Sequence, residues 1–105
     1  MFESFERSQI DSNGCRINVV HSGSGPGLLL LHGYPQNHVE WHKVAPRLAQ
    51  NFTVVCPDLR GYGDSEKPPS TNDDLSTYCK RTSARDQISV MQQLGHHKFH
   101  LVGHD

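Results

Sequence analysis

The chain has 105 residues, of which 34% are hydrophobic, and its formal net charge is −1 at pH 7. This balance of charges lacks the basic excess of nucleic-acid-binding proteins and gives no attraction to an anionic membrane surface. The longest apolar run covers only residues 28–31, whereas a transmembrane helix needs roughly 20 apolar residues. We therefore expect neither nucleic acid nor a membrane as a partner.

Cysteine usage indicates a reducing compartment. The three cysteines, Cys15, Cys56 and Cys79, are an odd and scattered set, which fits reduced thiols better than a disulfide framework. The first seven residues are too acidic and too interrupted for a secretory signal. Together these features predict a cytoplasmic location.

The N-terminal residues predict a β-hairpin. Two β-prone stretches, residues 5–10 and 15–21, flank residues 11–14. Asn13 and Gly14 both tolerate positive φ, so this pair is a strong hairpin signal. The second stretch alternates apolar and polar residues, which predicts a strand buried on one face. Its apolar members are Cys15, Ile17 and Val19, and its polar members are Arg16 and Asn18.

Two apolar runs, residues 28–31 and 53–56, predict strands that are buried on both faces. Between them, apolar residues follow the i, i+3, i+4, i+7 spacing of an amphipathic helix. Pro46 falls inside this pattern and would remove an internal hydrogen bond. We therefore expect a turn around Trp41, itself a core residue, and a regular helix that begins close to Pro46. The four apolar positions are Trp41, Val44, Ala45 and Leu48.

The remaining residues predict a loop, a helix and a last strand. Residues 58–74 are polar and rich in glycine and proline, which is typical of a surface loop. A helix over residues 77–94 follows, and Gly95 is well placed to end it. Residues 98–102 predict another strand. The helix is marked by Ala84, Ile88 and Met91. A hairpin followed by β-α-β-α-β predicts an α/β fold with a mainly parallel sheet covered by helices.

The first motif follows the strand predicted at residues 28–31 and reads His32-Gly33-Tyr34-Pro35. In open α/β sheets, ligands bind at the carboxyl ends of the strands, so this position suits an active site. Gly33 allows a tight turn that aims a peptide N–H into the cleft. The amide of Tyr34 is our candidate for half of an oxyanion hole. The alternative is a strand-ending turn without chemistry.

The second motif, residues 58–65, follows the next predicted strand. It loosely resembles a glycine-rich phosphate loop, but it lacks the P-loop lysine, and no helix begins directly after its glycines. We therefore favour a rigid turn in which Asp58 and Arg60 form local hydrogen bonds.

Four histidines gather near the C-terminus, at positions 96, 97, 100 and 104. His100 and His104 flank a predicted strand rather than sharing a helix face, and no cysteine lies close enough to complete a familiar zinc spacing. We therefore predict no metal and no cofactor.

The last three residues, Gly103, His104 and Asp105, follow the final predicted strand. A strand that runs into Gly-x-Asp is typical of the approach to a nucleophile elbow. In this order, the motifs resemble α/β-hydrolases of the dehalogenase and epoxide hydrolase group, and they are most similar to fluoroacetate dehalogenases. The similar strings are residues 1–3, 5–7, 32–36, 41, 44–46, 58–63 and 99–105.

The resemblance implies that residues 1–105 form the N-terminal portion of one α/β-hydrolase domain that stops at the nucleophile elbow, with the cap domain and the C-terminal half absent. It implies that Asp105 is the nucleophile. A carboxylate is already ionised at pH 7 and needs no base to activate it. It would displace halide from a haloacetate and form an ester, which a histidine-activated water then hydrolyses. The amide of Tyr34 would stabilise the charge that forms in this second step.

Several alternatives stay open. An epoxide hydrolase shares the aspartate nucleophile and the turn at residues 32–35, so the small-molecule substrate is a haloacid or an epoxide. A serine esterase is disfavoured by Asp105 itself. The family places its base histidine and supporting acid after the nucleophile, so the isolated chain is predicted to be inactive. It is then an inactive truncated product or an interaction module, whose last strand is an uncovered sheet edge. The histidines that family order excludes as the base are His21, His32, His38 and His42.

Overall fold

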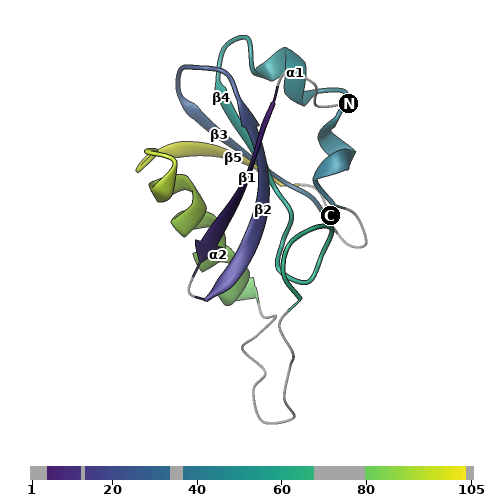
Figure 1. Cartoon of the computed structure of the whole chain (residues 1–105). Helices are drawn as coiled ribbons and strands as arrows, with labels where there is room; N and C mark the ends of the chain where they lie inside the picture. The colour runs from purple at the N-terminus through teal and green to yellow at the C-terminus, as the bar shows by residue number, and fades with distance from the viewer. Residues whose placement is uncertain (1–4, 13, 34–36, 68–79, 104–105) are drawn as a thin grey trace.

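The computed structural model describes residues 5–12, 14–33, 37–67 and 80–103. They form a five-stranded mixed sheet with helices on both faces (Figure 1). The strands are β1 (Glu6–Ser12), β2 (Cys15–Ser22), β3 (Gly27–Leu31), β4 (Thr53–Pro57) and β5 (Phe99–Gly103). The helices are a 3-10 turn η1 (His38–Trp41), α1 (Ala45–Leu48) and α2 (Lys80–Gln93).

The strand order across the sheet is β1-β2-β4-β3-β5. β2 is antiparallel to both β1 and β4, whereas β3 is parallel to both β4 and β5. Four of the strands therefore run in one direction and β2 runs against them. The predicted α/β fold, which opens with a hairpin, is confirmed. Ser12 pairs with Cys15 across the turn, where Gly14 has φ +86°, and Asn13 lies outside the described residues.

The core consists of two apolar layers, one on each face of the sheet. Alternate residues of β3 divide between them, because successive side chains of a strand point to opposite faces. Leu29 packs in the layer under α2, with Val90 and Met91. Leu28 and Leu30 pack in the other layer, which η1 and α1 cover (Figure 1). The second layer also includes the partly buried Trp41, Leu48, Ala49, Phe52 and Phe5.

The short helical segment confirms the expected effect of Pro46. Residues around Trp41 form only the 3-10 turn η1, and α1 begins at Ala45 with Pro46 in its first turn. A proline is tolerated there because the first N–H groups of a helix have no intrahelical acceptor.

α2 ends as predicted, since Gly95 follows it with φ +94°. Residues 77–79, where we expected it to begin, lie outside the described residues. Of the three apolar residues that marked this helix, only Met91 is buried, while Ile88 is 48% exposed. Polar Asp86 and Gln87 are buried in their place. Asp86 is buried because it binds an ion-pair partner described below, whereas the side-chain amide of Gln87 has no hydrogen-bond partner within the described part of the chain.

Burial of β2 differs from the prediction. Asn18 is fully buried, so the expectation of a strand buried on one face was wrong at this position. β2 lies inside the sheet between β1 and β4, and both of its faces are covered near the middle. The buried amide of Asn18 is satisfied by hydrogen bonds rather than by water.

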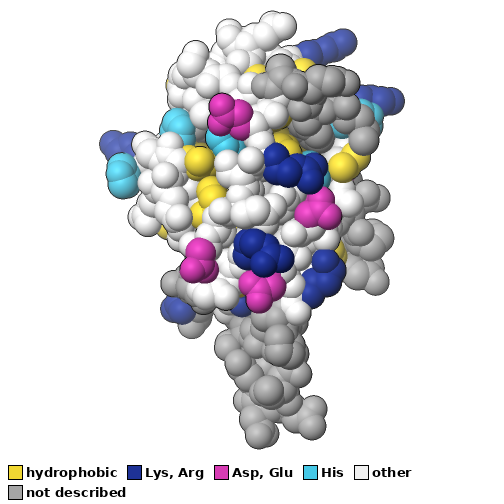
Figure 2. Space-filling view, in the orientation of Figure 1, with side chains coloured by type: hydrophobic (Ala, Val, Ile, Leu, Met, Phe, Trp, Pro, Cys, Tyr) yellow, Lys and Arg dark blue, Asp and Glu magenta, His cyan; other side chains and the backbone are white. Residues whose placement is uncertain are grey.

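The edge strand β5 leaves Leu101 58% exposed and Val102 43% exposed, as expected of an uncovered edge. No helix within the described ranges is long and apolar enough to cross a membrane. On the face shown in Figure 2, acidic and basic side chains alternate, in keeping with the net charge of −1.

Candidate functional site

The candidate site lies where the parallel strands β3, β4 and β5 end. Leu31 pairs with Gly103, so β3 and β5 end side by side at this edge of the sheet. Only some of the predicted site residues belong to the described part of the chain. His32 and Gly33 are described, whereas Tyr34, Pro35 and Asp105 lie outside the described residues.

His32 joins the loop after β3 to the loop after β4. Its side chain is buried at 3% exposure, and its Nε2 accepts a hydrogen bond of 3.0 Å from the backbone N–H of Leu59. Nδ1 must therefore carry the proton, and it donates to the carbonyl oxygen of Gly33 at 3.1 Å. The ring also meets Tyr62 edge-on, at 5.3 Å between centroids. His32 is thus an anchor between two loops, and both of its nitrogens are engaged.

The amide of Gly33 is also engaged. It donates to Oε1 of Glu40, in η1, at 2.9 Å. This N–H is directed into the protein rather than toward a ligand, and the amide of Tyr34, outside the described residues, stays a prediction as oxyanion donor. Glu40 was not singled out from the sequence.

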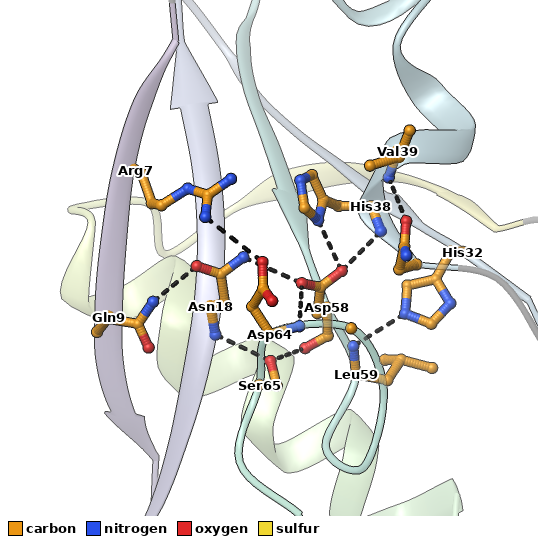
Figure 3. Close-up of polar contacts among 12 residues, drawn as sticks. Arg7, Gln9, Asn18, His32, His38, Val39, Asp58, Leu59, Asp64 and Ser65 are labelled. Carbon is orange, nitrogen blue, oxygen red and sulfur yellow. Dashed lines mark hydrogen bonds and ion pairs between the residues drawn. The ribbon is translucent and has the colours of Figure 1, made fainter. Parts of the chain in front are cut away.

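Asp58 is the most heavily bonded side chain of the described site (Figure 3). Its Oδ1 accepts from the backbone N–H of His38 at 2.7 Å and from Nδ1 of the same residue at 2.8 Å. Its Oδ2 accepts from Nδ2 of Asn18 and from the backbone N–H of Asp64, both at 3.0 Å. One buried carboxylate therefore links β2, η1 and the loop after β4.

These bonds determine the charge of Asp58. Burial by itself would raise the pKa of this carboxyl, but the hydrogen bonds from His38, Asp64 and Asn18 outweigh burial and lower the pKa from 3.8 to about 2. Asp58 is consequently ionised at neutral pH. It can act only as a hydrogen-bond acceptor there, so His38 presents a protonated Nδ1 to it.

The loop after β4 is a tight turn around the same carboxylate. The hydroxyl of Ser65 donates to the backbone carbonyl of Asp58 and accepts from the N–H of Asn18. Gly63 has φ +52°, and a Cβ there would lie only 2.5 Å from Cγ of Asp58. The expected rigid turn is confirmed. The expectation of a surface loop was wrong for Asp58, Arg60 and Ser65, which are all buried, because they supply the polar partners of neighbouring elements.

The expected local bonding is confirmed for Asp58, which accepts from the backbone N–H of Asp64, but Arg60 has a distant partner. Arg60 donates to Asp86 of α2, with Nε to Oδ2 at 2.7 Å and Nη2 to Oδ1 at 2.8 Å. Ser12, at the end of β1, donates to the same Oδ1 at 2.8 Å. This network fixes α2 against the sheet and explains why its polar edge faces inward.

Sequence reasoning missed His38, Asn18 and Asp86. A weak signal existed for Asn18 and Asp86, since both are polar residues beside positions that proved to be core. For His38 no local pattern pointed to Asp58, which lies 20 residues away. Among the described residues, no group of three or more His, Cys, Asp and Glu side chains is placed to hold a metal ion. His100 instead packs edge-on against Phe52, and His104 lies outside the described residues.

Comparisons with known proteins agree with this architecture. Residues 26–105 match the family model described as the alpha/beta hydrolase fold. A fluoroacetate dehalogenase from Burkholderia sp is 55% identical over 105 residues, which cover 100% of this chain and 34% of that protein. A soluble epoxide hydrolase from Corynebacterium sp. (strain C12) is 48% identical over 93 residues, 89% of this chain and 30% of that protein. A crystal structure of a candidate α/β hydrolase from Nostoc sp PCC 7120 matches with a TM-score of 0.95 at 56% identity, over 100% of this chain and 36% of that one. The chain spans about a third of the length of these relatives.

Proposed function

The chain belongs to the α/β-hydrolase fold family, and we propose that the full-length protein that contains it hydrolyses the carbon–halogen bond of a haloacetate, with Asp105 as the nucleophile. The observation that carries this proposal is the register of β3 and β5, in which Leu31 is paired with Gly103. This pairing places the ends of β3 and β5 at the same edge of the sheet, and in the sequence these ends are followed by His32 and, two residues after Gly103, by Asp105. The 55% identity to a fluoroacetate dehalogenase supports the choice of substrate.

The proposed reaction has two steps. In the first, a carboxylate oxygen of Asp105 attacks the carbon that bears the halogen, and the halide leaves with the bonding electron pair. The product is an ester between Asp105 and the remaining acetate group. In the second step, a histidine beyond residue 105 takes a proton from water, which attacks the carbonyl carbon of Asp105. Collapse of the tetrahedral intermediate breaks the ester bond, and the departing oxygen takes the proton from that histidine to give the 2-hydroxy acid. The Asp105 carboxylic acid then loses its proton to solvent, which restores the carboxylate.

The turn after β3 contributes to the second step only. Negative charge forms on the carbonyl oxygen of Asp105 when water attacks, and preorganised N–H donors stabilise such a charge. We assign one donor to the backbone of Tyr34 and the other to the residue that follows Asp105. His32, Gly33 and Pro35 shape this turn. Gly33 is not itself a donor in our proposal, because its N–H is bound to Glu40.

We further propose that residues 1–105 are the N-terminal portion of a single α/β-hydrolase domain, whose base histidine, supporting acid and cap lie further along the full-length protein. The proposed reaction takes a small-molecule substrate and requires no cofactor or metal. The cysteine usage supports a cytoplasmic location. By itself the 105-residue chain is expected to release no halide.

An epoxide hydrolase is the second candidate. It is supported by the 48% identity to the soluble epoxide hydrolase from Corynebacterium, and it would use Asp105 in the same way to open an epoxide ring. Residue 106 helps to discriminate, since arginine there favours a haloacid and tryptophan favours an epoxide or a haloalkane. A third candidate, an inactive truncated product, applies if no longer protein is made.

The test is to express the full-length product of the gene and offer it fluoroacetate, chloroacetate and a simple epoxide in separate reactions. We expect halide release from the haloacetates and none from the Asp105→Asn variant. A single turnover with enzyme in excess, run in ¹⁸O-labelled water, should place the label in the Asp105 carboxylate. Label found only in the product would contradict the ester intermediate. Epoxide opening without halide release would select the second candidate.

A further inference from the structure

The loops after β3 and β4 are joined at two separate points. At the first, Nε2 of His32 accepts from Leu59. At the second, Oδ1 of Asp58 accepts from both the backbone N–H and Nδ1 of His38. Leu59 and Asp58 are adjacent, so one short piece of the loop after β4 holds both described ends of the turn that follows β3 (Figure 3).

We propose that Asp58 is a positioning residue for the oxyanion hole, which it serves by fixing His38 and hence the far end of the turn that begins at His32. This inference rests on the proposed function. Asp58 touches no reacting atom in our proposal, and it acts on the oxyanion hole through its two hydrogen bonds from His38.

The chemistry of the contact requires a carboxylate. Four donors converge on Asp58, two on each oxygen, and an ionised carboxylate has acceptor capacity for all of them. An asparagine offers one oxygen and one NH₂ group. In either orientation its NH₂ would face a backbone N–H donor that cannot become an acceptor, either that of His38 or that of Asp64. One side of the network must then separate.

The two chemical steps respond differently to such a separation. Displacement of halide by Asp105 develops no oxyanion, so it does not depend on the turn after β3. Hydrolysis of the ester does depend on it, and a misplacement of about 1 Å in a catalytic group costs on the order of 10²-fold in rate. A loss of positioning therefore leads to accumulation of the ester, whereas a general loss of folded protein lowers both steps together.

The experiment compares Asp58→Asn with Asp86→Asn in the full-length protein. Both carboxylates are fully buried, but Asp86 bonds to Arg60 and Ser12 and is not bonded to the turn after β3. Rapid-quench measurements give halide formation, and intact-protein mass spectrometry gives the fraction of enzyme that carries the ester. We expect Asp58→Asn to slow ester hydrolysis on the order of 10²-fold and to leave halide formation nearly unchanged. We expect Asp86→Asn to leave the ratio of the two steps as in the wild type.

An unchanged ratio in Asp58→Asn, or an equal change in Asp86→Asn, would overturn the proposal. If Asp58→Asn does not fold, His38→Ala replaces it, since this change removes the imidazole contact and keeps the backbone N–H bond to Asp58. We expect ester accumulation in the same direction and to a smaller extent.

A readout without turnover separates this inference from the proposed function. The ¹H–¹⁵N spectra of wild type and variant report the His38 amide and its imidazole directly. We expect the downfield amide signal of His38 to move upfield in the variant, with further shifts at His32 and Gly33. Shifts confined to His38 would overturn the positioning role even if haloacetate is hydrolysed. If the full-length protein hydrolyses no haloacetate, the proposed function is wrong. The NMR comparison of wild type and variant then still decides whether Asp58 fixes the turn.

Discussion

Arg60 and Asp86 form a buried two-point ion pair, with Nε to Oδ2 at 2.7 Å and Nη2 to Oδ1 at 2.8 Å. The side chains are 8% and 0% exposed, and the residues lie 26 positions apart in the chain. Because Ser12 also donates to Asp86, the pair connects the loop after β4, helix α2 and the end of β1. A planar guanidinium matches a carboxylate at two points, which a lysine cannot do.

We predict that Asp86→Asn lowers the free energy of unfolding by about 3–5 kcal/mol, because it removes the buried negative charge that Arg60 binds at two points. Urea unfolding followed by circular dichroism measures this. The matched control is Asp64→Asn, which alters a surface ion pair between Arg7 and Asp64. The side chain of Arg7 is 59% exposed and that of Asp64 is 62% exposed. Exposed pairs contribute about 0–1 kcal/mol. Equal effects of the two substitutions would mean that the buried pair contributes no more than a surface pair.

Gly63→Ala is predicted to be more damaging than Gly14→Ala. Both glycines have positive φ, at +52° and +86°, so each alanine carries a strain of roughly 1–2 kcal/mol. At position 14 the new methyl group meets nothing within 4 Å, whereas at position 63 it lies 2.5 Å from Cγ of Asp58. Urea unfolding gives the loss of unfolding free energy for each variant. The loss for Gly63→Ala minus the loss for Gly14→Ala measures the cost of the clash between the new methyl group and Asp58. No difference would indicate that the loop moves aside at little cost.

The stability of the fold is predicted to fall in acid because of Asp58. Its pKa is lowered from 3.8 to about 2 in the folded protein, so the ionised group stabilises the fold above about pH 4, and this contribution is lost as the pH falls through about 2. A depression of this size corresponds to roughly 2 kcal/mol. The measurement is the unfolding free energy against pH for wild type and Asp58→Asn. The difference in unfolding free energy between wild type and Asp58→Asn should become smaller as the pH falls from about 4 to 2. A difference that stays constant over this range would contradict the lowered pKa of Asp58.

The thiol of Cys56 is predicted to be unreactive in the folded protein. Burial, assisted by the nearby negative charge of Asp58, raises the pKa of Cys56 to about 12, and only the thiolate attacks alkylating reagents. Treatment with iodoacetamide at about pH 8, followed by peptide mass spectrometry, should leave Cys56 unmodified until urea is added. Labelling of native protein at the rate seen in urea would show that this strand opens readily.

The sequence by itself determined the elements that depend on near neighbours. Asn13 and Gly14 predicted the hairpin, Pro46 predicted where α1 begins, and Gly95 predicted where α2 ends. Each of these signals acts through the conformational limits of one or two residues, so no distant contact is needed to read it. The order of strands and motifs likewise placed residues 32–33 and 58–59 at strand ends, and the structure confirms both placements.

Only the tertiary structure decided which polar groups meet. Asn18 sits in an alternating strand and was expected to face solvent, and Arg60 was expected to bond within its own loop. Their partners, Asp58 and Asp86, come from segments 40 and 26 residues away. Most buried polar groups find a hydrogen-bond partner, but sequence spacing does not say which one. The packing of β2 against β4, and of α2 against the sheet, makes that choice, because it sets which loops lie within bonding distance of each other.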